Sequence, residues 1–524
     1  MNFDVVVVGM GPVGAAAANL AGMWGLKTLV VDRLPDVYDK PRAFGLDHEV
    51  MRIFQNIGIA GEIGNVVMPY RTSEYRTTGG ALIKCIAPAQ APFPLGWAPN
   101  YVFSQPAVEK ALRARLRSWP NVTAMTGTEV LSVTPLADGM AVQLRDAAGA
   151  QREIQAAHVL ACDGGTSPIR TALGLEMEDL AFDEPWLVVD VLLNDENNAR
   201  LPSTNVQYCE TARPSTFIVG PGVHRRWEFM INPDESPSDI AQPDNIRKLL
   251  SRWLAPEEYR LWRASSYRFH ALVLKSWRQG NLFFLGDAAH MTPPFMAQGM
   301  CQGIRDAANL VWKLALVKSG QASADFLDSY QEERIPHVRH TTLVTKELGQ
   351  IICERDPDKA AERDRRMLEE MAKNPAPTIR QSLIPGLVSG FIARRDGDKT
   401  PGALFPQPVV EDALGREGML DDFGSQGFRL VYRADVDPAP LLAELDKAAP
   451  ALPVTPVPLL ESGSTANASI PGYRDKDGLL ERWMERHECR IVLVRPDHYV
   501  YGSASTPEQG VELIREMRRA LKPM

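Results

Sequence analysis

A glycine-rich turn near the N-terminus has the residue types needed to hold a diphosphate. Its six residues are Gly9, Met10, Gly11, Pro12, Val13 and Gly14, which form the pattern GxGxxG. The first glycine allows a tight turn, the second lets the backbone approach a pyrophosphate, and the third permits close helix packing. Asp32 ends the next apolar run, where its carboxylate can accept hydrogen bonds from ribose hydroxyls. The spacing therefore predicts a bound adenine dinucleotide.

A second acid, Asp287, stands in the stretch GDAAHMTPP, directly after the apolar run 281–285. A carboxylate at this place could bind the ribityl hydroxyls of a flavin. The helix expected from Gly299 would direct its N-terminus at the N1–C2=O edge of the ring, where it stabilises negative charge on reduced flavin. Together the two acids favour FAD among the dinucleotides.

The composition disfavours other chemistry. The nine histidines lack ligand spacing and the six cysteines include no CxxC pair, so neither a metal site nor a disulfide framework is expected. The net charge of −8 argues against nucleic-acid and membrane-surface partners. Because the sequence shows neither a signal peptide nor a long apolar run, we expect a cytoplasmic protein with reduced thiols.

These candidate residues need a framework, and the apolar pattern of the sequence indicates one. A chain of 524 residues predicts two or three domains. The run FDVVVV at 3–8 is typical of a buried parallel strand, and an alanine-rich helix and a strand at 27–32 complete a βαβ unit around the glycine turn. Alternating runs between 186 and 230 predict an antiparallel sheet. Further helices are expected at 106–118, 245–254 and 299–318, and further strands at 122–126, 130–134, 140–145, 152–162 and 267–274.

Four stretches together resemble the class A FAD-dependent aromatic hydroxylases, the para-hydroxybenzoate hydroxylase-like monooxygenases. They are GMGPVG at 9–14, PRAFGLDHEVMRIFQNIG at 41–58, CDGGTSPIR at 162–170 and GDAAHMTPPFMAQGMCQGIRDAANLVWKLA at 286–315. The resemblance extends from residue 1 to about residue 390. The C-terminal part is similar to the thioredoxin-like appendage of phenol hydroxylase-type enzymes. Among the subfamilies, the sequence is most similar to the 3-(3-hydroxyphenyl)propionate hydroxylases.

The resemblance implies an α/β (α+β) architecture of three parts. A Rossmann-like FAD-binding domain with a helical extension would comprise residues 1–75, 100–180 and 275–390, interleaved with an antiparallel-sheet substrate domain at 76–99 and 181–274. A thioredoxin-like domain would cover residues 400–524. Because that domain has no CxxC motif, a packing or dimerisation role is expected for it, and we expect a homodimer.

The resemblance also assigns residues to FAD. The glycine turn and Asp32 would hold the ADP half, and Asp287 would bind the ribityl chain. Gly299 and Met300 would present backbone N–H groups to the flavin ring. The remaining residues implied to contact the cofactor are Arg33, Arg42, Gln105, Asp163, Gly164 and Pro294.

The family chemistry is reduction of FAD by NAD(P)H, addition of O₂ to form a C4a-hydroperoxyflavin, and transfer of a hydroxyl group to an activated ring. For this protein we expect hydroxylation of a phenolic or hydroxylated heteroaromatic ring, ortho to the existing hydroxyl. The protein must orient the ring and exclude water. No second GxGxxG motif is present for the nicotinamide, so the choice between NADH and NADPH stays open.

Small aromatic substrates should contact three places: the loop after Arg42, one face of the antiparallel sheet, and the proline-rich loop. We expect Trp227 to face the pocket, and His48 could serve as a phenol base. Packing is the alternative role for Tyr208 and Trp227, a surface charge for Arg213 and helix capping for His48. The catalytic candidates are His48, Tyr208 and Pro293, and the substrate-binding candidates are Phe44, Leu46, Gln207, Arg213, Trp227 and Phe295.

Several functions remain compatible with the sequence. A substrate resembling 3-(3-hydroxyphenyl)propionate is favoured, and polyketide and N-heteroaromatic rings are alternatives. A flavin dehydrogenase could use the same fold. A halogenase is disfavoured because no WxWxIP segment is found, and a non-catalytic FAD-binding protein is disfavoured by the complete flavin-ring loop.

Overall fold

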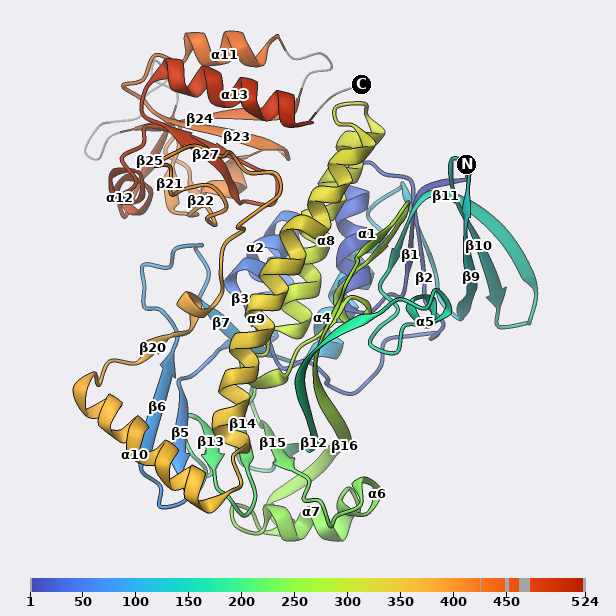
Figure 1. Ribbon diagram of the computed structural model, residues 1–524, viewed down its shortest axis with the longest axis vertical. Coiled ribbons are helices and arrows are strands. Elements are labelled where there is room, and N and C mark those ends of the chain that lie inside the picture. Colours follow the sequence, from blue (N-terminus) through green and yellow to red (C-terminus); the bar gives the residue numbers. More distant parts are fainter. Residues whose placement is uncertain (1, 425, 448–451, 461–471, 522–524) are drawn as a thin grey trace.

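The computed structural model describes residues 2–424, 426–447, 452–460 and 472–521 (Figure 1). Its first sheet contains the βαβ unit expected from the N-terminal pattern, formed by β1 (Phe3–Val8), α1 (Pro12–Met23) and β2 (Thr28–Val31). The central strand β1 pairs in parallel with both β2 and β11 (Gln151–Ala161). The valines at positions 5–8 are buried because the sheet is covered on both faces.

The sheet order is β17-β18-β11-β1-β2-β8, and β9 and β10 form an antiparallel extension from β11. The additional strands are β8 (Val122–Met125), β9 (Thr128–Leu136), β10 (Gly139–Asp146), β17 (Arg278–Gln279) and β18 (Leu282–Phe284). The carboxyl ends of β1, β2, β11 and β18 therefore lead into the glycine turn, Asp32, the 162–170 stretch and Asp287, respectively. Parallel pairing brings these four segments to one edge of the sheet.

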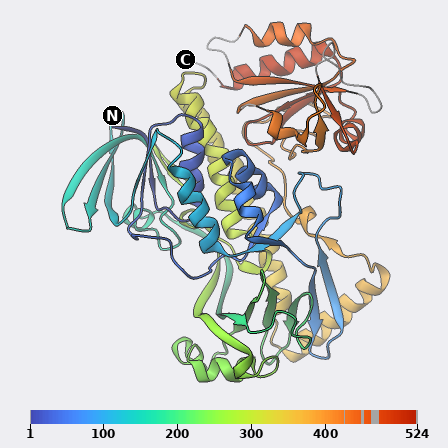
Figure 2. The same cartoon turned by 180° about the vertical axis from the view of Figure 1, so that it is seen from behind.

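Three helices pack together against this sheet: α1, α4 (Gln105–Leu116) and α8 (Gly299–Lys318). They lie side by side in the view from behind (Figure 2). The alanines of α1 and Gly303 of α8 allow this close approach. A β-carbon on Gly303 would lie 2.4 Å from Cγ2 of Val13. The long helix α9 (Ser329–Cys353) contacts α8 and extends to the second sheet (Figure 1).

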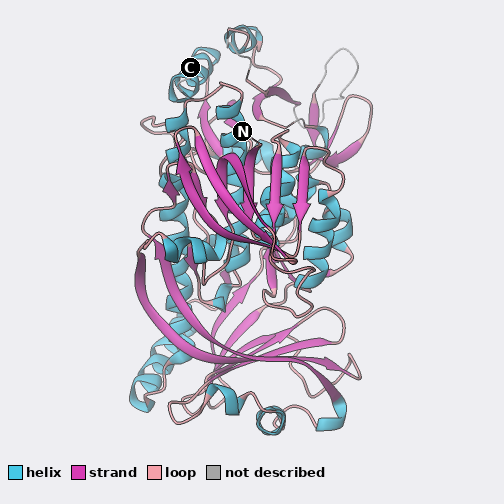
Figure 3. Cartoon of the chain, turned by 90° about the vertical axis from the view of Figure 1, so that its right-hand side faces the viewer, coloured by secondary structure: helices cyan, strands magenta, loops and turns pink. Residues whose placement is uncertain are grey.

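The second sheet has nine strands in the order β19-β16-β12-β15-β14-β13-β5-β6-β20. Its longest strands curve below the first sheet in the side view (Figure 3). One face packs on α6 and α7 through a cluster that includes Phe217, Trp227 and Trp253. The bounds are β5 (Ser73–Thr77), β6 (Leu82–Ala87), β12 (Met177–Leu193), β13 (Asn205–Cys209), β14 (Ser215–Val219), β15 (His224–Met230), β16 (Tyr259–Leu274), β19 (His290–Met291), β20 (Thr378–Ile379), α6 (Pro237–Ile240) and α7 (Pro243–Leu250).

Four strands of this sheet lie partly or wholly outside the segments expected for it. Strand β12 begins at Met177, and β19 comes from a segment expected in the FAD-binding domain. Strand β5 begins at Ser73, slightly before the expected boundary, and β20 comes from the part expected to be a helical extension. The helix α10 (Pro357–Lys373) packs on β6 beside them. The smaller elements near the join between the two sheets are β3 (Gly45–Asp47), α2 (His48–Ile57), α3 (Ala60–Gly64), β4 (Val67–Pro69), β7 (Asn100–Phe103), α5 (Pro168–Ala172) and the 3₁₀ turns η2 (Gly286–Ala288), η3 (Pro294–Met296) and η5 (Arg380–Leu383). A further 3₁₀ turn, η4 (Ala324–Asp328), packs at the far end of α8.

The C-terminal part forms a separate seven-stranded sheet in the order β22-β21-β25-β24-β23-β26-β27. This mixed sheet with flanking helices agrees with the thioredoxin-like unit expected there. It packs beside the far end of α8, where Trp312 contacts Phe391 and Phe428 (Figure 1). Its elements are β21 (Val409–Glu411), β22 (Glu417–Met419), η6 (Leu420–Phe423), β23 (Phe428–Arg433), α11 (Ala439–Leu445), β24 (Val454–Leu460), β25 (Tyr473–Asp475), α12 (Leu479–Arg486), β26 (Ile491–Val494), β27 (Val500–Ala504) and α13 (Pro507–Leu521). Within the described ranges, none of the helices combines the length and apolar character needed to cross a membrane.

Candidate active site

A cavity of about 570 Å³ runs from the edge of the first sheet to the open face of the second. All the residues expected to contact FAD line it. They are Gly9, Gly11, Pro12, Val13, Gly14, Asp32, Arg33, Arg42, Gln105, Asp163, Gly164, Asp287, Pro294, Gly299 and Met300. The segments that are far apart in the sequence therefore form one site.

The glycine turn has the close packing that its pattern predicted. Gly9 has a φ of +96°, and a β-carbon there would lie 2.4 Å from the carbonyl oxygen of Cys162. A β-carbon on Gly14 would lie 1.9 Å from the carbonyl oxygen of Gly9. A β-carbon on Gly11, in contrast, would meet no described atom within 4 Å. The turn is therefore packed against protein at Gly9 and Gly14 and open to a ligand at Gly11.

Asp32 fixes the turn as well as facing the cavity. Its carboxylate accepts hydrogen bonds from the backbone N–H groups of Met10 and Leu34, each at 2.8 Å. Arg113 from α4 donates to the same carboxylate at 3.3 Å and to the carbonyl of Met10 at 3.1 Å. This places an acid with a fixed orientation beside the glycine turn, as ribose binding requires.

Two further carboxylates on the cavity wall have oxygens without protein partners. Oδ1 of Asp163 is buried, and no hydrogen bond to it is found in the described part of the chain. The Asp287 carboxylate is exposed to the cavity and likewise accepts no hydrogen bond from a described residue. Desolvation inside the enclosed cavity raises the pKa of each of these acids. Because a buried polar atom is rarely left unpaired, Oδ1 of Asp163 suits a ligand rich in hydroxyl groups, and the Asp287 carboxylate is open to the same ligand.

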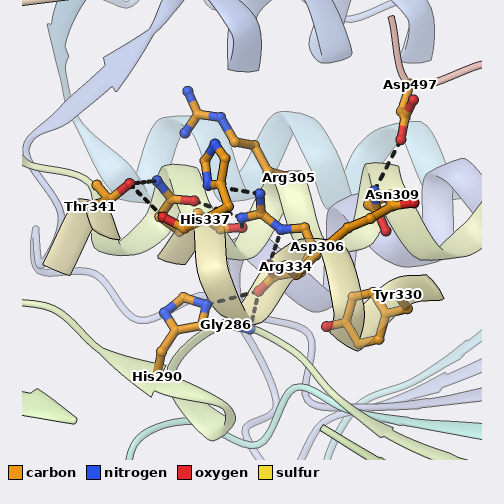
Figure 4. Close-up of polar contacts among 12 residues, drawn as sticks. Gly286, His290, Arg305, Asp306, Asn309, Tyr330, Arg334, His337, Thr341 and Asp497 are labelled. Carbon is orange, nitrogen blue, oxygen red and sulfur yellow. Dashed lines mark hydrogen bonds and ion pairs between the residues drawn. The ribbon is translucent and has the colours of Figure 1, made fainter. Parts of the chain in front are cut away.

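The loop that carries Asp287 is held by a buried network (Figure 4). The Asp306 carboxylate on α8 accepts hydrogen bonds from the backbone N–H of Gly286 at 3.0 Å and from Nε2 of His290 at 2.8 Å. Nε of Arg334 on α9 donates to the other oxygen of Asp306 at 2.8 Å. Burial alone would raise the pKa of Asp306, but Arg334 and His290 bring it below its usual value. His290 is therefore a structural residue that fixes the loop.

The N-terminus of α8 also points at the cavity. Gly299 and Met300 form its first turn and line the cavity, and a β-carbon on Gly299 would meet no described atom within 4 Å. Ala297, just before the helix, has a φ of +49°. The first N–H groups of a helix lack partners within it and carry partial positive charge. This helix end can therefore bind the polar edge of a planar ring.

These observations fit FAD. The site offers an open backbone approach at Gly11, unpaired carboxylates at Asp163 and Asp287, and a helix N-terminus at Gly299. Gln105 completes the wall, since its side-chain oxygen accepts hydrogen bonds from the backbone N–H groups of Arg42 at 3.1 Å and of Ala43 at 2.5 Å. The loop bearing Arg42 is thereby fixed over the cavity.

The other half of the cavity is formed by one face of the second sheet. Residues at alternate positions of the neighbouring strands β13, β14 and β15 point the same way, and the register places Thr216 opposite both Gln207 and Glu228. The hydroxyl of Thr216 donates to the side-chain oxygen of Gln207 at 2.6 Å. The residues of this face that line the cavity are Gln207, Thr216, Ile218, Arg226 and Glu228.

Arg226 is fixed by Asp190 of β12. Its Nε and Nη2 donate to the two carboxylate oxygens at 2.7 and 3.0 Å, and Nη1 donates to the carbonyl of Arg42 at 3.0 Å. Its guanidinium lies 4.5 Å from the ring centroid of Phe44, which also lines the cavity. Burial would raise the pKa of Asp190, but Arg226 and His224 lower it. The charge of Arg226 is thus compensated within the protein.

The expectation that Trp227 faces the pocket was wrong. Trp227 lies on the opposite face of β15, packed against Phe217 and Trp253, while Arg226 and Glu228 face the cavity. The alternation along the strand was predicted correctly, but the face was not. The aromatic side chains are buried under α7, and the polar side chains line the cavity.

Two other sheet candidates are also placed away from the cavity. Tyr208 packs on Trp253, and Nε1 of Trp253 lies 3.3 Å from the hydroxyl of Tyr208. Arg213 forms hydrogen bonds with Glu235 at 2.5 and 2.9 Å and with the carbonyl of Met230 at 2.9 Å. Its charge is therefore already paired. Both residues have the packing or surface roles that were the alternatives.

The remaining candidates divide in the same way. Phe44, Gln207 and Phe295 line the cavity, whereas Leu46, Pro293 and His48 do not. Leu46 belongs to the core and Pro293 is buried between cavity residues. His48 begins α2 behind the cavity wall, and burial lowers its pKa to about 4. The imidazole is therefore neutral near pH 7 and has no access to a phenol in the cavity.

Three of the cavity residues that sequence reasoning missed carry charge. Arg226 and Glu228 were assigned to the wrong face of β15, although their alternation with aromatic residues was visible. Arg380 begins η5, in the segment expected to belong to the helical extension of the FAD-binding domain, and it lines the cavity. Its Nη2 donates to the carbonyl of Met296, and its guanidinium lies 4.8 Å from the ring centroid of Tyr70. No local pattern in the sequence signals this position.

The comparisons with known proteins agree with the fold and the cavity. The family described as "FAD binding domain" matches residues 2–345, and the one described as "HcaD C-terminal domain" matches residues 402–520. The chain therefore belongs to the FAD-binding family of flavin-dependent aromatic hydroxylases. It is an FAD-dependent monooxygenase rather than a non-catalytic FAD-binding protein.

Two curated relatives extend over nearly the whole chain. A probable NADH-specific resorcinol 4-hydroxylase of Rhodococcus jostii is 34% identical, over 99% of this chain and 96% of that protein. A 3-(3-hydroxy-phenyl)propionate/3-hydroxycinnamic acid hydroxylase of Burkholderia cenocepacia is 33% identical, over 97% and 94%. Among solved structures, the flavin-dependent monooxygenase PieE in complex with FAD and substrate has a TM-score of 0.83 at 20% identity, with 100% of both chains covered. Aklavinone-11 hydroxylase has a TM-score of 0.77 at 23% identity, with 99% of both chains covered.

Proposed function

We propose that the protein hydroxylates a small phenol ortho to its hydroxyl group, with a ring that carries an acidic side chain as the favoured substrate. The observation that carries this proposal is the cavity that joins the FAD residues to a polar face of the second sheet. The relative from Burkholderia cenocepacia, named for 3-(3-hydroxyphenyl)propionate, supports this class of substrate.

Within this proposal the chain's residues have three tasks. The glycine turn, Asp32, Asp163 and Asp287 hold the cofactor. Bound FAD supplies reduction by NAD(P)H and activation of O₂. Phe44 and Phe295 contact the substrate ring and exclude water, which protects reactive species from solvent. NADH is the nicotinamide to test first, because the Rhodococcus jostii relative is named NADH-specific.

Arg380 is the residue we propose for an acidic side chain of the substrate, in place of Arg213. It is nearly buried, and among the described residues neither Nε nor Nη1 has a hydrogen-bond partner. A guanidinium with free N–H groups can bind a carboxylate in a bidentate manner. In the second candidate function the substrate is a neutral dihydroxybenzene, which the resorcinol-named relative favours, and Arg380 would then have no anion to bind.

A panel of phenols tests the proposal. It contains 3-(3-hydroxyphenyl)propionate, 3-hydroxycinnamate, resorcinol, phenol and a polycyclic phenol. NADH and NADPH oxidation, O₂ consumption and product mass are measured for each. We expect one of the first three to accelerate nicotinamide oxidation and to yield a product one oxygen atom heavier. Flavin reduction without hydroxylation of any compound would contradict the proposal, and turnover under nitrogen with an artificial acceptor would indicate a dehydrogenase.

We also propose that the protein acts in the cytoplasm as a homodimer whose subunits are held in part by the C-terminal domain. The absence of CxxC from that domain supports a packing role over redox work. Light scattering after size-exclusion chromatography, at several protein concentrations, tests the oligomeric state. A monomer at all concentrations would contradict the homodimer.

A further inference from the structure

The carboxylate of Glu228, on the substrate side of the cavity, accepts no hydrogen bond from any described residue. Glu228 lines the cavity, yet only 5% of its surface is exposed. Within the described ranges no N–H or O–H group donates to it, and its only charged contact is Nη1 of Arg226 at 3.9 Å. A buried carboxylate normally has several donors. A molecule that fills the cavity can therefore supply the missing donor.

The surrounding charges do not supply that donor. Arg226 is held by Asp190, and the like charge of Asp190 disfavours ionisation of Glu228. On the next strand, the hydroxyl of Thr216 is directed to Gln207 instead. The other cationic residues that line the substrate side of the cavity, Arg42 and Arg380, belong to different walls. Glu228 is thus an acceptor presented to the ligand.

We propose that Glu228 accepts the hydrogen bond of the substrate's phenolic hydroxyl and takes its proton during hydroxylation. This inference rests on the proposed function and assigns a base to it, a role for which His48 is wrongly placed. Thr216 and Gln207 lie beside Glu228 on the same face and position the ring. The acceptor therefore stands on a rigid sheet, opposite the FAD half of the cavity.

The proton transfer is balanced without any further reactant. The phenolic O–H bond breaks, an O–H bond forms on Glu228, and the negative charge passes from the carboxylate to the ring oxygen. The ring becomes more electron-rich, which favours attack by an electrophilic oxygen. Burial raises the pKa of Glu228 to about 7, although Arg226 opposes the shift. A base with a pKa near the working pH is effective in proton transfer.

Ligand binding provides the first test. 3-(3-Hydroxyphenyl)propionate and its 3-methoxy counterpart, and resorcinol and 3-methoxyphenol, are titrated into FAD-loaded protein by calorimetry at pH 8. We expect the wild type to prefer the free phenol by about 10-fold or more, because a charged acceptor is lost to the ether. Glu228→Leu should abolish that preference. A preference that survives in Glu228→Leu would overturn the proposal.

The pH profile provides the second test. In the wild type, kcat for hydroxylation should fall as the pH drops below about 7, whereas Glu228→Gln should lower kcat about 100-fold and remove this acid limb. Glu228→Asp should restore part of the limb. Glu184→Gln, which changes a carboxylate of β12 outside the cavity, should leave the profile unchanged. FAD content and thermal unfolding show whether each variant is folded.

The two proposals fail in different ways. An active wild type together with a Glu228→Gln variant of unchanged kcat and acid limb would overturn the role of Glu228 alone. A wild type that binds none of the four compounds, or binds them without hydroxylating any, would contradict the proposed function and the base with it.

Discussion

Replacing Glu228 with glutamine should stabilise the protein increasingly as the pH rises. Folding raises the pKa of this carboxyl from 4.5 to about 7. The ionised group is therefore less stable in the folded than in the unfolded chain. The penalty is absent below the unfolded pKa, grows between the two values and is complete above the folded one. A difference of this size corresponds to about 3 kcal/mol at high pH, since one pKa unit is worth ~1.4 kcal/mol.

The measurement is the thermal midpoint of wild type and Glu228→Gln between about pH 5 and about pH 8. The linkage relation predicts that the difference in free energy of unfolding between Glu228→Gln and wild type grows by about 2.5 kcal/mol over this range. If the two sheets unfold as one cooperative unit, with an unfolding entropy of ~2 cal/mol/K per residue, the difference in thermal midpoint grows by about 3 °C. The exposed Glu347→Gln on α9 serves as control and should show a constant gap. Parallel curves for wild type and Glu228→Gln would refute the view that Glu228 is buried without donors.

Three further predictions follow from the site and its supports. Asp287→Ala should weaken FAD binding by about 1.5–3 kcal/mol, the value of a hydrogen bond to a charged group. Fluorescence titration with FAD measures this loss, and thermal unfolding shows whether the variant is folded. Arg380→Met should raise KM for 3-(3-hydroxyphenyl)propionate by about 10-fold or more and leave KM for resorcinol unchanged; equal effects on both would exclude a carboxylate contact. Glu333→Gln should destabilise the chain by about 3–5 kcal/mol, because Lys313 and Arg495 then stay buried without the negative charge that pairs with both. Limited proteolysis of this variant should cut between the C-terminal unit and the rest. Unchanged proteolysis of Glu333→Gln would show that the ion pairs do not hold that unit.

The sequence predicted the dinucleotide half of the site well because its signals are local. The GxGxxG pattern is typical of a tight turn between a strand and a helix, so the residues at 9–14 indicate which elements flank them. The same holds for Asp287, which follows a buried strand directly, and for α8, whose observed bounds Gly299–Lys318 agree with the expected range. The positions of these residues needed no knowledge of distant contacts.

The substrate half was predicted less well because its signals are not local. Alternation along β15 separates Trp227 from Glu228, but it does not say which face meets the cavity, since that depends on where α6 and α7 pack. Arg380 reaches the cavity only because β20 pairs with β6, a contact between segments far apart in the chain. Resemblance to the family could not correct these assignments, because none of the four motifs at 9–14, 41–58, 162–170 and 286–315 contains Trp227, Glu228 or Arg380.

The contacts of the C-terminal unit have a consequence for how this chain can change over evolutionary time. Arg52 of α2 donates to Asp421 at 2.7 Å, the hydroxyl of Tyr499 donates to Glu49 at 2.9 Å, and Glu49 in turn accepts from Arg305 of α8 at 2.5 Å. Arg495 pairs with Glu333 at 2.7 Å. The Arg52–Asp421, Tyr499–Glu49 and Arg495–Glu333 contacts each join two buried charged or polar groups, one from each side of the boundary. Loss or exchange of the unit by recombination would leave their partners unpaired, so the two parts are expected to be inherited together and to vary in a correlated way.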